Sequence, residues 1–209
     1  MNNISFYATM TSFTIVILVW FIFAGTFWFG FAKNLLARKD VSAVREKTRS
    51  NNSFVGIAFQ GLSFGLVWGL HRDPFLSPFI DEQYFLNVVL QILAIALVVF
   101  SIWLARSAIN ELGKQWSFAA RLIEDHKLIT SGVYRIVRNP IYTAMFGMLL
   151  ATGIAFSHWI VLLIAVVVFL IGARIRITAE EKLLRAAFPA EYDEFAGRVP
   201  ALIPFVKIF

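Results

Sequence analysis

Long apolar runs alternate with shorter polar segments along most of the chain. Each run is close to the roughly 20 residues that an α-helix needs to cross the hydrocarbon core of a bilayer. We therefore expect five membrane-spanning helices, at Ser12–Ala32, Phe54–Leu70, Tyr84–Ala105, Pro140–Phe156 and Trp159–Ala173. This pattern predicts an all-α integral membrane protein.

The link between the last two apolar runs is very short, because only Ser157 and His158 separate them. So short a connection predicts an antiparallel helical hairpin. A hairpin returns the chain to the membrane face from which it entered. It would bring the turn at 139–142 close to the polar segment Arg174–Glu181.

The composition agrees with a membrane protein. Of the 209 residues, 59% are hydrophobic and 15% are charged, and the mean hydropathy is +0.73. Soluble domains are roughly 45–50% apolar and about 25% charged. The absence of cysteine excludes disulfides, thiolate metal ligands and a cysteine nucleophile. The net charge of +6 is better explained by basic loops that set topology than by a nucleic-acid partner.

The distribution of charge predicts the topology. The segment Lys33–Arg49 is strongly basic, whereas His71–Gln83 carries three acids and one arginine. By the positive-inside tendency, the first segment is expected in the cytoplasm and the second outside. The polar segment Arg106–Asn139 and the C-terminal tail are then cytoplasmic, and the N-terminus is outside. We expect the first apolar run to be retained rather than cleaved as a signal peptide.

The segment Leu128–Tyr142 is polar and basic, and it leads directly into the fourth apolar run. Gly132 permits a turn there. Asn139 and Pro140 form a helix-start signal, because asparagine can cap a helix and proline is tolerated in the first turn. This cytoplasmic segment is therefore expected to turn tightly into a membrane helix.

The segment Arg174–Glu181 holds two acid–base pairs at helical spacing. Arg176 and Glu180 are expected to share one helix face, and Arg174 and Glu181 another. A carboxylate beside arginines stays ionised and can hold an ammonium group, while an arginine can bind a carboxylate. Such a pocket could hold a zwitterion and, next to it, an anionic headgroup.

Other interpretations of these residues remain open at this point. Arginines at helix ends commonly reach the interface and fix topology without another role. Thr178 and Glu181 fit a capping box that would begin a new helix. Arg176 and Glu180 could form a surface ion pair worth about 0–1 kcal/mol. The three histidines lie in separate segments, so no metal site is expected.

The second apolar run is rich in glycine. Gly61, Gly65 and Gly69 are spaced by four residues, a pattern typical of close helix packing in lipid. A transporter would require polar or ionisable residues near the span midpoints. The spans offer only a few uncharged polar residues, such as Gln60 and Thr152, which argues against transport.

The C-terminal half resembles the isoprenylcysteine carboxyl methyltransferase family, within a wider group that includes phospholipid N-methyltransferases. The matching stretches, in chain order, are Leu112–Ser117, His126–Tyr134, Arg138–Tyr142, Glu180–Glu181, Phe188–Tyr192 and Arg198–Lys207. The resemblance covers residues 106–209, whereas 1–105 match only as apolar spans. We therefore divide the chain into an N-terminal membrane region, 1–105, and a methyltransferase-like region, 106–209.

The resemblance implies a membrane-embedded methyltransferase whose pocket faces the cytosol and binds S-adenosylmethionine. The implied cofactor contacts are His126, Lys127, Leu128, Ile129, Tyr134, Asn139, Pro140, Ile141, Tyr142 and Glu180. Arg176 matches the substrate-side arginine of the family, and Arg106 is a looser match to another basic position near the reaction centre. The family usually has histidine where this chain has Asn139, and asparagine cannot titrate. Cofactor binding can survive that change, but a proton-transfer role cannot.

The chemistry mildly favours a carboxylate as the methyl acceptor. A carboxylate is already ionised at neutral pH and needs no general base, whereas an amine or thiol needs a route for deprotonation. We therefore expect a prenylated, isoprenylcysteine-type substrate that enters from the bilayer. The alternatives are a phospholipid N-methyltransferase, a small-thiol S-methyltransferase, and a non-catalytic membrane scaffold with the same fold.

Overall fold

The computed structural model describes residues 18, 21–22, 25, 46–49, 52–70, 84–117, 121–123 and 126–206. Most of this part of the chain is helical. Its elements are β1 (Glu46–Arg49), α2 (Asn52–Gly69), α3 (Tyr84–Leu112), the 3₁₀ helix η1 (Gly113–Gln115), β2 (Arg121–Ile123), the 3₁₀ helix η2 (Gly132–Arg135), α4 (Pro140–Phe156), α5 (Trp159–Ala187) and α6 (Pro189–Arg198).

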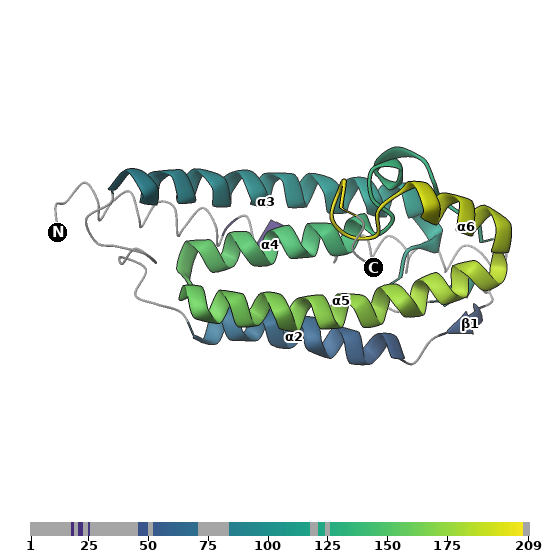
Figure 1. The fold of residues 1–209 in the computed structure, drawn as a ribbon, viewed down its shortest axis with the longest axis horizontal. Helices are drawn as coiled ribbons and strands as arrows, with labels where there is room; N and C mark the ends of the chain where they lie inside the picture. Colours follow the sequence, from purple (N-terminus) through teal and green to yellow (C-terminus); the bar gives the residue numbers. More distant parts are fainter. Residues whose placement is uncertain are drawn as a thin grey trace.

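The four long helices lie side by side as a bundle (Figure 1). Helix α3 packs mainly on α4, and α2 packs mainly on α5. Contacts between α4 and α5 join these two pairs. Helix α6 and the segment that follows it cover one end of the bundle (Figure 1).

Two of the helices are long and apolar enough to cross a membrane, at Val89–Gln115 and Trp159–Ala187. Only 39% and 33% of their most apolar windows are buried inside the protein. On α5 the exposed large apolar side chains follow one helix face: Ile160, Leu163, Ile164, Val167 and Ile171. Surface of this kind requires an apolar surrounding, so the chain is a membrane protein.

The expectation of five spans is only partly tested. Helices α2 and α4 contain shorter apolar stretches, Ser53–Gly69 and Pro140–Ala155. The expected first span, Ser12–Ala32, lies almost wholly outside the described residues. The number of spans therefore stays a prediction.

The predicted helical hairpin is confirmed. Helix α4 ends at Phe156 and α5 begins at Trp159, so only two residues link them. The two helices run antiparallel and side by side (Figure 1). The start of α4 thus lies beside the C-terminal half of α5, as the short link predicted.

Two helices extend further than the sequence pattern predicted. Helix α3 continues past Ala105 to Leu112, and α5 continues through Arg174–Glu181 without a break. The capping-box interpretation of Thr178 is therefore wrong. The residues after Ala173 are mostly good helix formers without glycine or proline, so hydrogen bonding continues after the apolar run has ended. Helix α5 stops only next to Pro189, as expected from the restriction on the residue before proline.

One short two-stranded antiparallel sheet accompanies the helices, so the described part of the chain is mostly rather than entirely helical. Strand β1 pairs with β2, with Glu46 opposite Ile123 and Arg49 opposite Arg121. Strands this short carry too few residues for an alternating pattern to be recognised. The pairing joins two polar segments that were both predicted to be cytoplasmic, and places them at one end of the molecule.

The close helix contact of α2 differs from the predicted one. Among the described residues, nothing lies within 4 Å of a Cβ atom built on Gly61, Gly65 or Gly69. The close approach occurs instead where Gly56 of α2 meets Gly172 of α5. A Cβ atom on Gly172 would lie 2.8 Å from the carbonyl oxygen of Gly56. These two glycines allow the backbones of α2 and α5 to touch.

Candidate functional site

A cavity of about 560 Å³ opens at the end of the bundle where α4 begins. Its wall is built from α2, the start of α4, the C-terminal half of α5, α6 and the segment 126–129. Side chains of the wall are mostly apolar, with a few polar groups among them. Ligand sites in proteins are typically of about 300–1,000 Å³ and have this composition.

The segment before α4 turns as the sequence predicted. Gly132 has a φ of 56°, a left-handed conformation that favours glycine. Beside it, the Ser131 hydroxyl donates a hydrogen bond of 3.1 Å to Glu111 of α3. This turn buries Tyr134 in the cavity wall. Burial, and then the nearby carboxylates of Glu180 and Glu111, raise the pKa of Tyr134, so its hydroxyl stays protonated.

Four polar side chains meet on the cavity wall and form what we call the pocket cluster: Gln60, Tyr142, Arg176 and Glu180. The Tyr142 hydroxyl donates a hydrogen bond to Glu180. The Arg176 guanidinium lies over the Tyr142 ring, 4.7 Å from its centroid, and donates a 2.9 Å hydrogen bond to Gln60 Oε1. Its Nη2 lies 3.9 Å from Glu180 Oε1, so the predicted pairing of Arg176 and Glu180 is confirmed.

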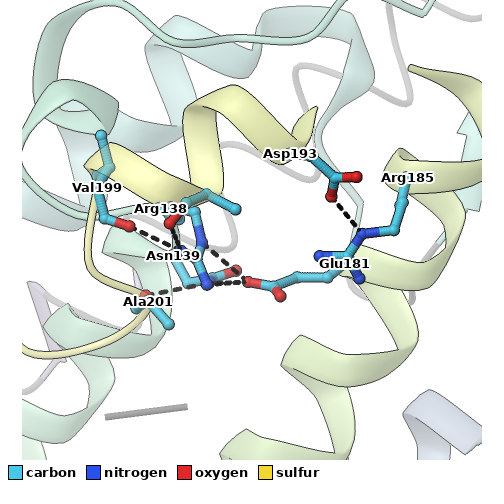
Figure 2. Close-up of polar contacts among 8 residues, drawn as sticks. Arg138, Asn139, Glu181, Arg185, Asp193, Val199 and Ala201 are labelled. Atoms are coloured by element: carbon cyan, nitrogen blue, oxygen red, sulfur yellow. Dashed lines mark hydrogen bonds and ion pairs between the residues drawn. The ribbon is translucent and has the colours of Figure 1, made fainter. Parts of the chain in front are cut away.

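A second set of polar side chains lies next to the pocket cluster and faces the C-terminal segment (Figure 2). Arg138 lies 3.1 Å from Glu181 and donates hydrogen bonds to the carbonyl oxygens of Ala196 and Val199 at 2.8 and 2.7 Å. Glu181 was expected to share a face with Arg174. Both lie in the unbroken helix α5, where Glu181 points toward the start of α4 and contacts Arg138, while Arg174, two turns earlier, is exposed. Only the packing of the hairpin brings Arg138 within reach of Glu181.

Asn139 occupies the N-cap position of α4, as predicted, but its side chain does not cap the helix. Its amide donates to the carbonyl oxygen of Ala201 at 3.0 Å and to Glu181 at 3.4 Å. We call Arg138, Asn139 and Glu181 the tail clamp, because they hold the segment 196–201 against the start of α4 (Figure 2). Asn139 therefore contacts the C-terminal segment as well as lining the cavity.

The structure gathers almost all of the predicted site residues around this cavity. The lining residues include His126, Lys127, Leu128, Ile129, Tyr134, Asn139, Pro140, Ile141, Tyr142, Arg176 and Glu180. Arg106 is the exception. It lies on an exposed part of α3 and does not line the cavity.

Other lining residues were not predicted. Gln60 comes from α2, and Tyr192 and Phe195 come from α6. The only sequence signal for Gln60 is that it is a polar residue inside an apolar run. Tyr192 belongs to a stretch that carries the family resemblance, whereas Phe195 has no signal beyond helical amphipathicity.

Comparison with known proteins identifies relatives that match much of this chain. Residues 89–191 match the family described as phospholipid methyltransferase. Over 150 residues the chain is 31% identical to the protein-S-isoprenylcysteine O-methyltransferase of Schizosaccharomyces pombe, covering 70% of this chain and 61% of that relative. A probable protein-S-isoprenylcysteine O-methyltransferase of Oryza sativa subsp. indica is 28% identical over 148 residues, covering 70% and 75%.

A third relative, protein-S-isoprenylcysteine O-methyltransferase B of Arabidopsis thaliana, is 33% identical over 116 residues, covering 54% of this chain and 58% of that relative. The match to the fission yeast protein spans about three fifths of its length. The family match includes the tail clamp and three residues of the pocket cluster, whereas Gln60 lies before it.

Proposed function

We propose a methyltransferase function on the premise that this chain, as its sequence predicted, is a relative of the isoprenylcysteine carboxyl methyltransferases within the phospholipid methyltransferase family. A methyltransferase family implies a methyl donor. The chain transfers a methyl group from S-adenosylmethionine to a lipophilic acceptor. The acceptor that fits best is the carboxylate of an isoprenylcysteine-type substrate.

The observation that carries this proposal is the pocket cluster inside an otherwise apolar cavity. An arginine with an exposed fraction of 9% and a glutamate with one of 29% face each other there. Buried charges are costly unless they are paired or serve a ligand. A site with both charges suits a ligand pair that includes an ammonium and a carboxylate.

The wall fits the proposed cofactor by its chemistry. Glu180 would hold the ammonium group, because its carboxylate lies at the cavity and is steadied by the Tyr142 hydroxyl. The segment 126–129 and Tyr134 would form the rest of the cofactor wall, together with the turn at 139–142. When bound, S-adenosylmethionine supplies a methyl group on a positively charged sulfur.

The apolar side chains of the cavity wall suit a lipophilic acceptor. Ile57 and Phe64 of α2 and Met145 of α4 line the cavity with apolar surface. Arg176 would orient the acceptor carboxylate, because a guanidinium binds a carboxylate through two parallel hydrogen bonds. A carboxylate oriented in this way needs no general base, so the chain has only to align it and exclude water.

A phospholipid amine is the second candidate acceptor, since the matching family is described as phospholipid methyltransferase. An ammonium headgroup would have to lose a proton before methylation. It would also lie next to the arginine of the pocket cluster, which disfavours a cation. A small thiol would also have to lose a proton before methylation.

The proposed topology places this cavity on the cytoplasmic side of the membrane. The N-terminus is then outside and the C-terminus is cytoplasmic. Pairing of β1 with β2 supports a common side for the two polar segments that contain them. The regions 1–105 and 106–209 share the cavity, because α2 contributes part of its wall. Membrane lipid surrounds the exposed apolar faces and delivers the substrate.

The first experiment is calorimetric titration of the detergent-purified protein with S-adenosylmethionine, with Glu180→Ala as the comparison. Saturable binding that the variant loses is the expected result. Incubation with labelled S-adenosylmethionine and an N-acetyl-S-farnesylcysteine probe should then yield a base-labile methyl ester. A well-folded protein that binds no cofactor in detergent or in lipid would favour the scaffold function instead.

A further inference from the structure

Gln60 is a buried polar residue on a helix that lies outside the family match. It has an exposed fraction of 2% and lies on the cavity wall. Its side-chain oxygen accepts the hydrogen bond from Arg176. Its side-chain nitrogen is also buried and has no hydrogen-bond partner among the described residues. A buried donor without a partner is costly and calls for an explanation.

The orientation of this amide follows from the chemistry of its neighbour. A guanidinium group has only donors, so Gln60 must turn its oxygen toward Arg176. The NH₂ group is then the end of the amide that is left for another partner. That partner must be an acceptor, since an NH₂ group can only donate.

We propose that Gln60 Nε2 donates a hydrogen bond to the carboxylate of the methyl acceptor, beside Arg176. This inference rests on the proposed function and deepens it. Two neighbouring groups that can only donate favour a ligand with acceptor oxygens and disfavour an ammonium headgroup. Gln60 thereby selects a carboxylate acceptor over a phospholipid amine.

Helix α2 also makes room for the arginine. Gly56 precedes Gln60 by one helical turn, and a Cβ atom at Gly56 would overlap the Arg176 side chain. The missing side chain leaves a channel for the methylene groups of Arg176, and Gln60 receives the guanidinium at its end. One face of α2 thus provides both the space for the Arg176 side chain, at Gly56, and a second hydrogen-bond donor, Gln60 Nε2.

The test compares Gln60→Glu with Gln60→Met in kinetics with N-acetyl-S-farnesylcysteine. Both replacements are close in size to glutamine. Glutamate keeps an oxygen for Arg176 but lacks the NH₂ donor, whereas methionine lacks both groups. If Gln60 binds the acceptor, KM should rise by about tenfold to a hundredfold in both variants, as for the loss of a hydrogen bond to a charged group. S-adenosylmethionine affinity should stay within about twofold of wild type, since that site uses other residues.

A double-mutant cycle separates ligand binding from positioning, because the negative charge of Gln60→Glu would repel a carboxylate in either case. If Gln60 only held Arg176 in place, Gln60→Met would raise KM no further in an Arg176→Met background, and that result overturns the proposal. The control is Ser63→Ala, at a buried position of the same helix that does not line the cavity. It should leave KM unchanged, and a KM rise equal to that of Gln60→Glu would also overturn the proposal.

The wild-type protein distinguishes failure of the inference from failure of the proposed function. Cofactor binding with methyl-ester formation establishes the proposed function before any variant is made. If the wild type binds S-adenosylmethionine but methylates a phospholipid amine and no carboxylate, both the acceptor and the role of Gln60 are overturned. If it forms the ester and Gln60→Glu has an unchanged KM, only the inference fails.

Discussion

Arg138 and Arg176 are equally buried, with a side-chain exposed fraction of 9% each, and each has a glutamate of α5 beside it. Their other partners differ. Arg138 donates to two backbone carbonyls of the C-terminal segment and contacts Glu181 at 3.1 Å. Arg176 donates to a side chain of the cavity wall and lies 3.9 Å from Glu180.

From this difference we infer that the fold uses two similar ion pairs for two purposes. Successive residues on a helix point about 100° apart, so Glu180 and Glu181 face different neighbours. The tail clamp binds groups that are permanently part of the chain, and therefore serves stability. The side chains of the pocket cluster bind one another on the cavity wall, and under the proposed function they serve a ligand. Substitutions should separate the two by their effects on unfolding and on binding.

The largest effect on stability is expected from Arg138→Met. Removal of this arginine leaves two carbonyls of the tail without their donor and Glu181 without its ion-pair partner. Loss of one partner of a buried pair costs about 3–5 kcal/mol. Thermal unfolding in detergent should show it as a large fall in Tm. Arg185→Met is the matched control, because Arg185 pairs with Asp193 at 2.7 Å but both are more than half exposed. That control should change stability by at most about 1 kcal/mol, and equal effects would contradict the comparison.

Arg176→Met should act on turnover instead. We expect a fall of about a hundredfold in kcat/KM for the farnesylcysteine probe, the result of losing charge-assisted hydrogen bonds to a carboxylate. Calorimetric affinity for S-adenosylmethionine should change much less. Equal losses of cofactor affinity and turnover would count against the placement of Arg176 on the acceptor side.

The adjacent glutamates offer a direct test of the two faces. Glu180→Gln should raise the Kd for S-adenosylmethionine by about tenfold to a hundredfold, because an amide holds an ammonium less well than a carboxylate. Glu181→Gln should instead lower Tm and change the Kd little. A Glu181 variant that loses cofactor binding while remaining folded would remove the distinction between the tail clamp and the pocket cluster.

Asn139→Ala should have the smallest of these effects. It removes the 3.0 Å hydrogen bond to Ala201 and the longer one to Glu181. The expected loss is about 1 kcal/mol of unfolding free energy, the usual net worth of a neutral hydrogen bond. Thr152→Ala provides a comparison from the same helix, because its hydroxyl donates to the carbonyl oxygen of Met148, also in α4. A larger loss of unfolding free energy in Thr152→Ala than in Asn139→Ala would contradict the role of Asn139 in the tail clamp.

The hairpin could be predicted because its signals are local. Two apolar runs with a two-residue link between them can pack only as neighbours, so their polar ends had to meet. The turn at Gly132 and the helix start at Pro140 follow from residue chemistry in the same way. The β1–β2 pairing could not be predicted, because its strands are short and far apart in the sequence.

The sequence by itself determined that this is a membrane protein with a helical hairpin, and which residues of the hairpin ends could form a methyltransferase site. Apolar run length and residue chemistry are local properties, so they can be recognised along the chain. Only the tertiary structure decided that Glu181, the neighbour of the predicted pocket residue Glu180, contacts the tail clamp partners Arg138 and Asn139. It also brought Gln60 to Arg176 across 116 residues, because the packing of α2 on α5 depends on the close meeting of Gly56 and Gly172.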